Sequence, residues 1–243
     1  MTDHRGSFVL SRDLFVCGLG LVYLIAFVSL WTQILGLVGS HGIIPIGEYL
    51  DFVHSRIGDA AYWRLPTLCW IDSSDAMLQA LCATGTIASA ALILGLAPIP
   101  ILMVLWVLYL SASVAGQDFL SFQWDSLLLE AGVLALFVAP RGWWMRLRLP
   151  GETGVTSPTE PWRPGLWLLR LLVFKLMFLS GITKLLSGDP TWRNLSAMSY
   201  HYQTQPIPTW TSWYMDHLPV TFHRVECLVM FVIEIGVPFL LHA

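Results

Sequence analysis

Three ionisable side chains lie inside apolar stretches of the sequence, where a charge needs a partner. Lys175, Glu130 and Glu234 each lie seven to nine residues from an end of their stretch, about 10–13 Å deep if the stretch is helical. At such depth in a bilayer, a charge costs at least about 2.5–3.5 kcal/mol. We therefore expect a buried ion pair of Lys175 with Glu130 first and with Glu234 second. Such a pair would fix the register of the helices, and a proton relay is the alternative chemistry.

Two further cations stand nearer the ends of the stretch Leu166–Leu186. Arg170 is four residues from its start and Lys184 is two residues from its end. Both side chains are long enough to place their charge at the membrane surface. We expect them to act as interfacial anchors.

The histidines and cysteines could hold a metal ion, but their spacing matches no ligand template. The four cysteines form no CxxC pair, and five histidines fall in two polar connections. These histidines are His41, His54, His201, His217 and His223. The sequence also lacks a GxSxG elbow, an HExxH helix, a Walker loop and a GxGxxG motif. We therefore expect no metal site, no cofactor and no catalytic residue of these kinds.

Six stretches of about 20 apolar residues are the elements that must position these side chains. Each is long enough to cross a bilayer as a helix, which satisfies the backbone polar groups in lipid. The stretches are residues 14–38, 76–97, 99–115, 119–139, 166–186 and 225–241. The sequence predicts an all-α, polytopic integral membrane protein, a bundle of about six transmembrane helices with two longer exoplasmic loops. We expect a single membrane domain over residues 1–243.

Composition excludes the soluble and the nucleic-acid-binding classes of protein. Of the 243 residues, 56% are hydrophobic and 12% are charged, whereas soluble domains carry about 25% charged residues. The formal net charge is −3, from 13 Lys and Arg against 16 Asp and Glu. No basic surface is therefore expected for a phosphate backbone.

Arginine counts favour cytoplasmic termini, because cytoplasmic loops carry an excess of Lys and Arg. With both termini inside, the cytoplasmic arginines are Arg5, Arg12, Arg141, Arg146, Arg148 and Arg163, and the exoplasmic ones are Arg56, Arg64, Arg193 and Arg224. The loop 140–165 is then cytoplasmic, and the loops 39–75 and 187–224 are exoplasmic. Within the first exoplasmic loop, Pro45–Ile57 has apolar residues at helical spacing. This predicts a short amphipathic helix that lies on the membrane or caps the bundle.

Two polar strings carry a resemblance to a known family. They are Gly116–Asp125 (GQDFLSFQWD), which leads into Leu127–Glu130, and Ser187–Asn194 (SGDPTWRN), which leads into Tyr200–Pro208 (YHYQTQPIP). Both resemble the lipase maturation factor family, and the likeness extends to Phe222–Arg224 and to Glu234–Phe239.

The resemblance implies a membrane-embedded maturation factor or chaperone, not an enzyme. Its partners would be the lipid bilayer and exported proteins, lipases by resemblance, whose folding and assembly it assists. It implies the endoplasmic reticulum membrane, or the bacterial inner membrane if the host is prokaryotic. Family members usually continue with a large exoplasmic domain, so a chain that stops at Ala243 resembles a truncated or bacterial member.

The exoplasmic loop 187–224 is the candidate client-binding surface. Its candidate residues are Trp192, Tyr200, His201, Tyr202, Gln205, Pro206, Trp213 and His223. Aromatic rings of this loop, Trp210 and Tyr214 included, could hold apolar segments of a client. The same rings could instead form an interfacial belt at the membrane surface.

A weaker resemblance indicates a membrane enzyme. Phe178–Leu185 (FLSGITKL), followed by Trp192, is similar to the stretch around the active lysine of vitamin K-dependent gamma-carboxylases. It implies that Lys184 is a base with a quinol-type cofactor nearby. A transporter that uses the charges Glu130, Lys175 and Glu234 is a second alternative, although neither the broken spans nor the inverted repeats of transporters are evident.

Overall fold

The computed structural model describes residues 7–145, 160–207 and 209–241. Its contacts divide the chain into two units, Met1–Leu166 and Trp167–Ala243. Parts of the predicted topology lie outside the described residues, namely Arg5, Arg146, Arg148, Pro208 and most of the loop 140–165. The orientation in the membrane and the single domain remain predictions.

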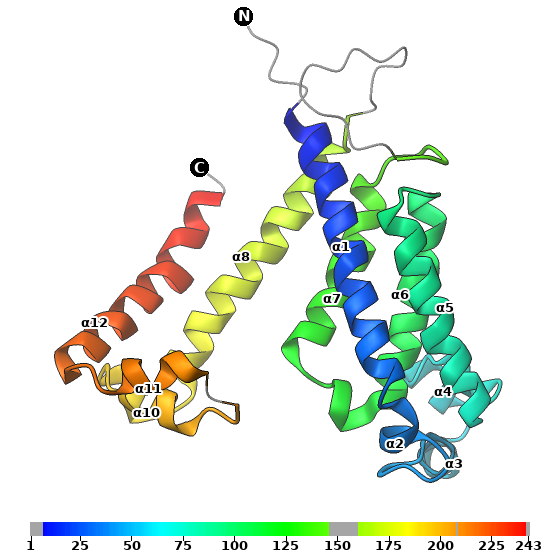
Figure 1. Ribbon diagram of the computed structural model, residues 1–243, viewed down its shortest axis with the longest axis horizontal. Coiled ribbons are helices and arrows are strands. Elements are labelled where there is room, and N and C mark those ends of the chain that lie inside the picture. The colour runs from blue at the N-terminus through cyan, green and yellow to red at the C-terminus, as the bar shows by residue number, and fades with distance from the viewer. Residues whose placement is uncertain (1–6, 146–159, 208, 242–243) are drawn as a thin grey trace, which may run out of the picture. The chain divides into compact units, whose positions relative to one another are not determined.

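Four long helices form the first unit. They are α1 (Ser7–Trp31), α5 (Asp75–Ile93), α6 (Pro98–Gly116) and α7 (Gln123–Val138). Figure 1 shows them side by side in blue and green. α1 contacts α5, α5 contacts α6, α6 contacts α7, and α7 contacts α1, so the four helices close into a bundle. In the described part of the chain, helices account for all regular structure beyond one isolated bridge, and the predicted all-α class is confirmed.

Local sequence signals explain where two of these helices begin. The Ser74 hydroxyl accepts a hydrogen bond from the backbone N–H of Met77 at 3.3 Å and caps α5. Pro98 occupies the first turn of α6, where its missing N–H is not needed. The turn between the two helices uses Gly95 at a φ of +80°, a conformation that favours glycine.

Short helices connect α1 to α5 at one end of the bundle (Figure 1). They are α2 (Ile34–Val38), α3 (Ile46–Ile57), α4 (Ala60–Arg64) and the 3-10 turn η2 (Leu68–Trp70). The helix expected over Pro45–Ile57 is α3. Its residues Ile46 and Leu50 are buried in the core of the unit. Of the two roles left open for this helix, the packing favours a cap on the bundle.

The core of the first unit contains a buried carboxylate that is held by hydrogen bonds. Tyr109 of α6 packs edge-on against Tyr23 and Phe27 of α1, with both ring centroids 5.7 Å away. The Tyr109 hydroxyl donates to Asp125 Oδ1 at 2.6 Å, and the backbone N–H of Phe122 donates to Oδ2 at 3.3 Å. Asp125 is 3% exposed. The two hydrogen bonds replace part of the hydration that this carboxylate loses on burial.

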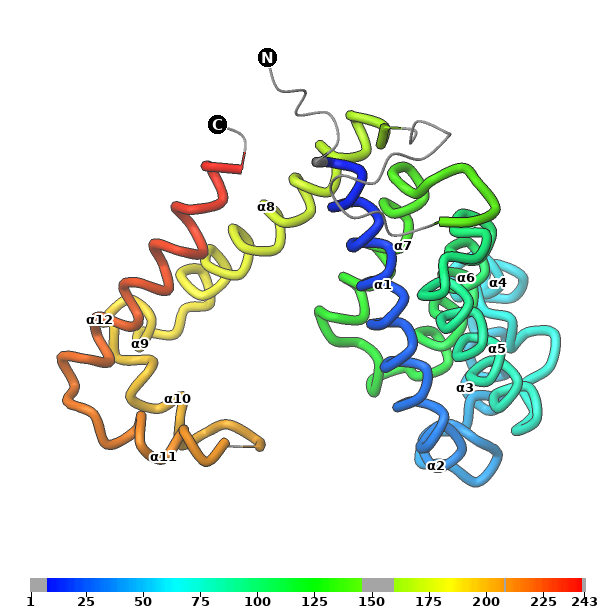
Figure 2. The backbone as a smooth tube through the Cα atoms, turned by 45° about the horizontal axis from the view of Figure 1, so that its top comes forward, coloured from blue at the N-terminus to red at the C-terminus, as the bar shows by residue number. Residues whose placement is uncertain are grey.

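The second unit contains two longer helical segments joined by short helices (Figure 2). The two longer helices are α8 (Arg163–Leu186) and α12 (Val220–Phe231). The short helices between them are α9 (Pro190–Arg193), α10 (Met198–Thr204) and α11 (Trp210–Asp216). After α12 the chain continues as the π-helical turn η4 (Val232–Gly236) and the 3-10 turn η5 (Val237–Leu241).

Four helical segments are long and apolar enough to cross a membrane. Among the described residues these are Phe8–Trp31, Asp75–Ile93, Pro98–Leu120 and Arg163–Leu186. The chain is therefore an integral membrane protein. The other two predicted stretches correspond to α7, which has 16 residues, and to α12 with η4 and η5. That these two segments also cross the bilayer remains a prediction.

We expect Tyr109→Phe to destabilise the first unit. The change keeps the ring but leaves the buried Asp125 carboxylate without its shortest hydrogen bond, which costs about 1–3 kcal/mol. Thermal unfolding of the purified protein in detergent should show a lower melting temperature. Tyr62→Phe is the matched control, because Tyr62 is 47% exposed. This variant should melt at the same temperature as the wild type. Equal melting of both variants and the wild type would contradict this role of the hydroxyl.

Candidate functional site

The eight candidate residues of the loop 187–224 lie in the second unit, between the end of α8 and the start of η4 (Figure 2). The loop begins with a capped turn. Gly188 has a φ of +81°, and Asp189 accepts hydrogen bonds from the backbone N–H of Thr191 at 2.9 Å and from its hydroxyl at 2.8 Å. These two bonds hold the pKa of Asp189 below its ordinary value. With Pro190 in the first turn, this sequence fixes the start of α9.

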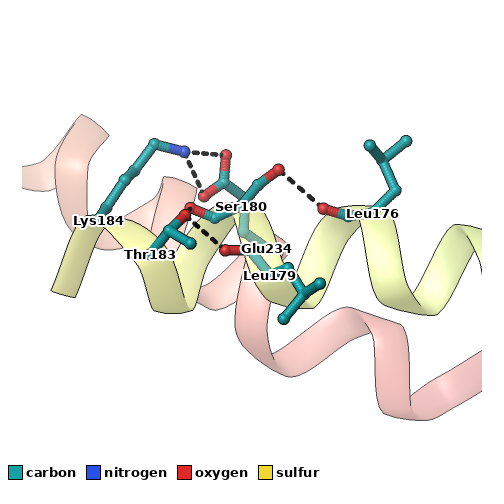
Figure 3. Close-up of polar contacts among 6 residues, drawn as sticks. All are labelled: Leu176, Leu179, Ser180, Thr183, Lys184 and Glu234. Carbon is teal, nitrogen blue, oxygen red and sulfur yellow. Dashed lines mark hydrogen bonds and ion pairs between the residues drawn. The ribbon is translucent and has the colours of Figure 1, made fainter. Parts of the chain in front are cut away.

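An ion pair joins α8 to η4. Lys184 Nζ lies 2.6 Å from both carboxylate oxygens of Glu234 (Figure 3). The two side chains keep 26% and 18% of their exposed surface, respectively. Nζ also lies 5.7 Å from the ring centroid of Trp192 in α9, and that ring packs edge-on against Phe231. The Lys184 side chain of α8 therefore contacts η4 through Glu234 and the start of the loop through Trp192.

The neighbouring turn of α8 is built for close approach. The hydroxyls of Ser180 and Thr183 donate to the carbonyls four residues earlier, at 2.7 and 2.6 Å (Figure 3), so the helix satisfies its own polar side chains. A Cβ on Gly181 would lie 2.5 Å from Ile235 Cγ1 and 3.1 Å from Glu234 Cβ. Only glycine allows this contact, which is typical of helix packing in lipid.

Glu234 lies in the π-helical turn η4, and the sequence explains why the α-helix changes there. Pro238 has no N–H to donate to the carbonyl of Glu234, four residues earlier. Gly236 adds backbone freedom between them. Single π-helical turns inside helices occur often at functional sites.

A second carboxylate, Glu226 of α12, holds the loop onto that helix. The Tyr202 hydroxyl of α10 donates to Glu226 Oε1 at 2.8 Å, and His223 Nδ1 lies 3.0 Å from Oε2. Because a carboxylate only accepts, Nδ1 must carry the proton. His223 is 2% exposed, and its ring centroid lies 5.8 Å from that of Tyr202. Burial and the Glu226 carboxylate raise the pKa of Tyr202 to about 12, so its hydroxyl remains a donor at neutral pH.

The helices α10 and α11 are joined by a side-chain hydrogen bond. Gln203 Nε2 lies 3.1 Å from both carboxylate oxygens of Asp216. Just after α10, the Gln205 amide nitrogen lies 2.9 Å from His201 Nε2. Tyr200 is 57% exposed in α10, and Trp213 is 62% exposed in α11. The outer surface of the loop is thus aromatic and carries few charges.

The structure divides the eight candidate residues of the loop into two groups. Trp192, Tyr202 and His223 have partners inside the unit and form its framework. Tyr200, His201, Pro206 and Trp213 are exposed, and Gln205 is half-buried beside His201. Glu226, which links Tyr202 to His223, was not among the residues predicted from the sequence. Its position three residues after His223 on a helix was the available signal.

The sequence predicted that Lys175 pairs with Glu130 first and with Glu234 second, and the structure bears on only part of this prediction. The partner that the structure gives Glu234 is Lys184, a residue expected at the membrane interface. Pairing between Lys175 and Glu130, which belong to different units, remains a prediction. In the described part of the chain, no group of three or more His, Cys, Asp or Glu side chains could hold a metal ion.

Comparison with known proteins identifies the family. A family model described as the lipase maturation factor transmembrane domain matches residues 10–243. The chain belongs to the lipase maturation factor family. Lipase maturation factor 2 of Gallus gallus is 43% identical over 94% of this chain and 32% of its own length. The Homo sapiens protein of that name is 41% identical over 94% of this chain and 33% of its own length.

Lipase maturation factor 1 of Homo sapiens is also similar, at 38% identity over 98% of this chain and 42% of its own length. The chain thus spans about a third of the length of the lipase maturation factor 2 relatives. No solved structure matches the chain significantly.

We expect the Lys184–Glu234 pair to stabilise this lipase maturation factor domain. Lys184→Met leaves a mostly buried carboxylate without its cation, and removal of one partner of such a pair costs about 1–3 kcal/mol when some solvent access remains. Thermal unfolding in detergent should show a lower melting temperature for Lys184→Met and for Glu234→Gln.

The double variant, Lys184→Met with Glu234→Gln, is the control for this prediction. Without an unpaired charge, it should melt at a higher temperature than at least one single variant. The double-mutant cycle should give a coupling free energy of about 0.5–3 kcal/mol. Purely additive effects of the two changes would mean that the contact contributes nothing to stability.

Proposed function

We propose that this chain is a membrane-embedded maturation factor that assists the folding and assembly of exported proteins, with lipases as clients. The observation that carries the proposal is the family match over residues 10–243. The membrane would be the endoplasmic reticulum in a eukaryotic host and the inner membrane in a bacterial one. The relatives' names supply the client class, and the physical features of the loop 187–224 support a binding role.

The loop combines a fixed framework with an exposed edge. Glu226 ties α10 to α12, and Lys184 contacts both Glu234 and Trp192. Because these contacts hold the short helices in place, little conformational entropy is lost when a partner binds. On α10 the exposed edge presents Tyr200 and His201, and Pro206 follows it. Rigid, exposed rings of this kind are typical anchors for a protein partner.

The Lys184–Glu234 contact favours this proposal over the alternative of a carboxylase-like enzyme. A lysine that acts as a base needs a free lone pair on Nζ. Here Nζ lies 2.6 Å from both oxygens of a carboxylate, a geometry typical of a charge-assisted hydrogen bond. This geometry suits a structural cation.

Complementation tests the proposed function. A host that lacks its own maturation factor is given this chain, and the activity of a secreted lipase is measured per amount of lipase protein. The wild-type chain should raise that specific activity. Tyr200→Ala with His201→Ala should lower the gain roughly tenfold, as expected if two contact residues together contribute about 1.4 kcal/mol to client binding.

Trp63→Ala is the matched control, since Trp63 is an exposed ring in the first unit, 89% accessible. All variants are compared at equal membrane abundance. A wild-type chain that leaves lipase activity unchanged would overturn the maturation role. If the wild-type chain complements and the variant with Tyr200→Ala and His201→Ala complements equally well, only this edge is removed from the proposed binding surface.

A further inference from the structure

One face of α11 consists of aromatic rings. Trp210, Trp213, Tyr214 and His217 follow the spacing i, i+3, i+4, i+7, which places them on one side of a helix. We call these four residues the aromatic stripe. Trp210 is 80% exposed, and Trp213 and Tyr214 are each 62% exposed. Such exposure of three large rings on two turns of helix is typical of a surface that contacts a partner or a membrane.

The rings of the stripe support one another. Tyr214 lies edge-on to Trp210 and to Trp213, with centroid separations of 6.3 and 5.1 Å. Trp213 lies 4.2 Å from the His217 ring, and His217 Nδ1 lies 2.7 Å from the Trp213 carbonyl oxygen. The stripe is therefore ordered before any partner binds.

The remaining contacts of α11 fix the stripe outward. Asp216 is bound by Gln203 of α10. At the first turn, the Thr209 carbonyl accepts from the backbone N–H of Ser212 at 2.9 Å, and the Thr209 hydroxyl lies 3.1 Å from that of Ser212. Since Asp216, which is not part of the stripe, binds α10, the aromatic side is left for an external surface.

Two features of the chain favour lipid as that surface. The stripe carries no carboxylate, guanidinium or ammonium group, and its indole and phenol rings are the amphipathic groups enriched where membranes meet water. The exposed apolar surface also continues along the chain through Leu218, Val220 and Phe222 into α12. The 23 residues 187 to 209, which include α9 and α10, separate α11 from α8, a helix apolar enough to span.

We propose that α11 is an interfacial anchor whose aromatic stripe lies in the headgroup region of the bilayer. The anchor would hold the loop 187–224 at the membrane surface and leave Tyr200 and His201 of α10 on the water side. This inference goes beyond the proposed function, because it assigns a lipid-binding surface and does not depend on the identity of a client.

Spin labels test the position of the stripe. In a Cys17→Ala background, which removes the one half-exposed native cysteine, single Trp213→Cys and Tyr200→Cys variants are labelled and reconstituted into phosphatidylcholine vesicles. Power saturation is compared for oxygen, which concentrates in lipid, and for a nickel chelate, which stays in water. The label at 213 should favour oxygen several-fold more than the label at 200.

Equal access of the nickel chelate to both labels would overturn the proposal, because the stripe would then lie in water and be open to a protein partner. A second measurement tests the proposal even if a spin-labelled variant fails to fold. Brominated lipids should quench the tryptophan fluorescence of the wild-type protein more than that of Trp210→Phe with Trp213→Phe. Equal fractional quenching would also overturn the proposal, and neither result bears on complementation by the chain.

Discussion

The second unit depends on the contact between Lys184 and Glu234. Apolar helices gain little from burying their surfaces against one another in lipid, so specific packing and polar contacts must hold them together. Around this pair, Gly181 admits Ile235, and Phe239 packs edge-on against Phe174 and Phe178 at 5.2 and 5.8 Å. The ion pair adds direction to this packing, because only one register brings the carboxylate to the ammonium. It also contacts Trp192, so the start of the loop depends on the same register.

Two carboxylates at the C-terminal end of the chain organise the candidate site. Glu234 anchors η4 to α8, and Glu226 anchors α10 to α12. These two contacts position the short helices of the loop 187–224, whose outer side is aromatic. The loop thus combines an internal framework with exposed rings. Rigid presentation of this kind lowers the entropy cost of binding a partner.

The fold was predictable because its main signal is local. Runs of apolar residues identify membrane helices with no knowledge of their partners. Contacts between distant residues left no such signal. Lys184 was expected at the membrane interface, because counting residues along the stretch gives the depth of a side chain. The count does not reveal that Glu234, 50 residues later in the sequence, lies beside it. Glu226 with His223 was within reach of the sequence as an i, i+3 pair, whereas Tyr202, 24 residues away, was not. The polar strings of the sequence predicted the family correctly, since they combine many residues that apolar composition cannot specify.

Exchange of the two charges tests whether the Lys184–Glu234 pair holds the second unit together. Lys184→Glu alone places two carboxylates together, and Glu234→Lys alone places two ammonium groups together. Each should therefore reduce membrane abundance severalfold and, under the proposed function, lipase maturation as well. The variant with both changes restores an opposite pair and should recover much of both. Recovery of maturation would also exclude Lys184 as an essential base, because the exchanged protein has no lysine at that position. Full abundance of the Lys184→Glu protein, or failure of the exchange to improve on either single variant, would contradict this role of the ion pair.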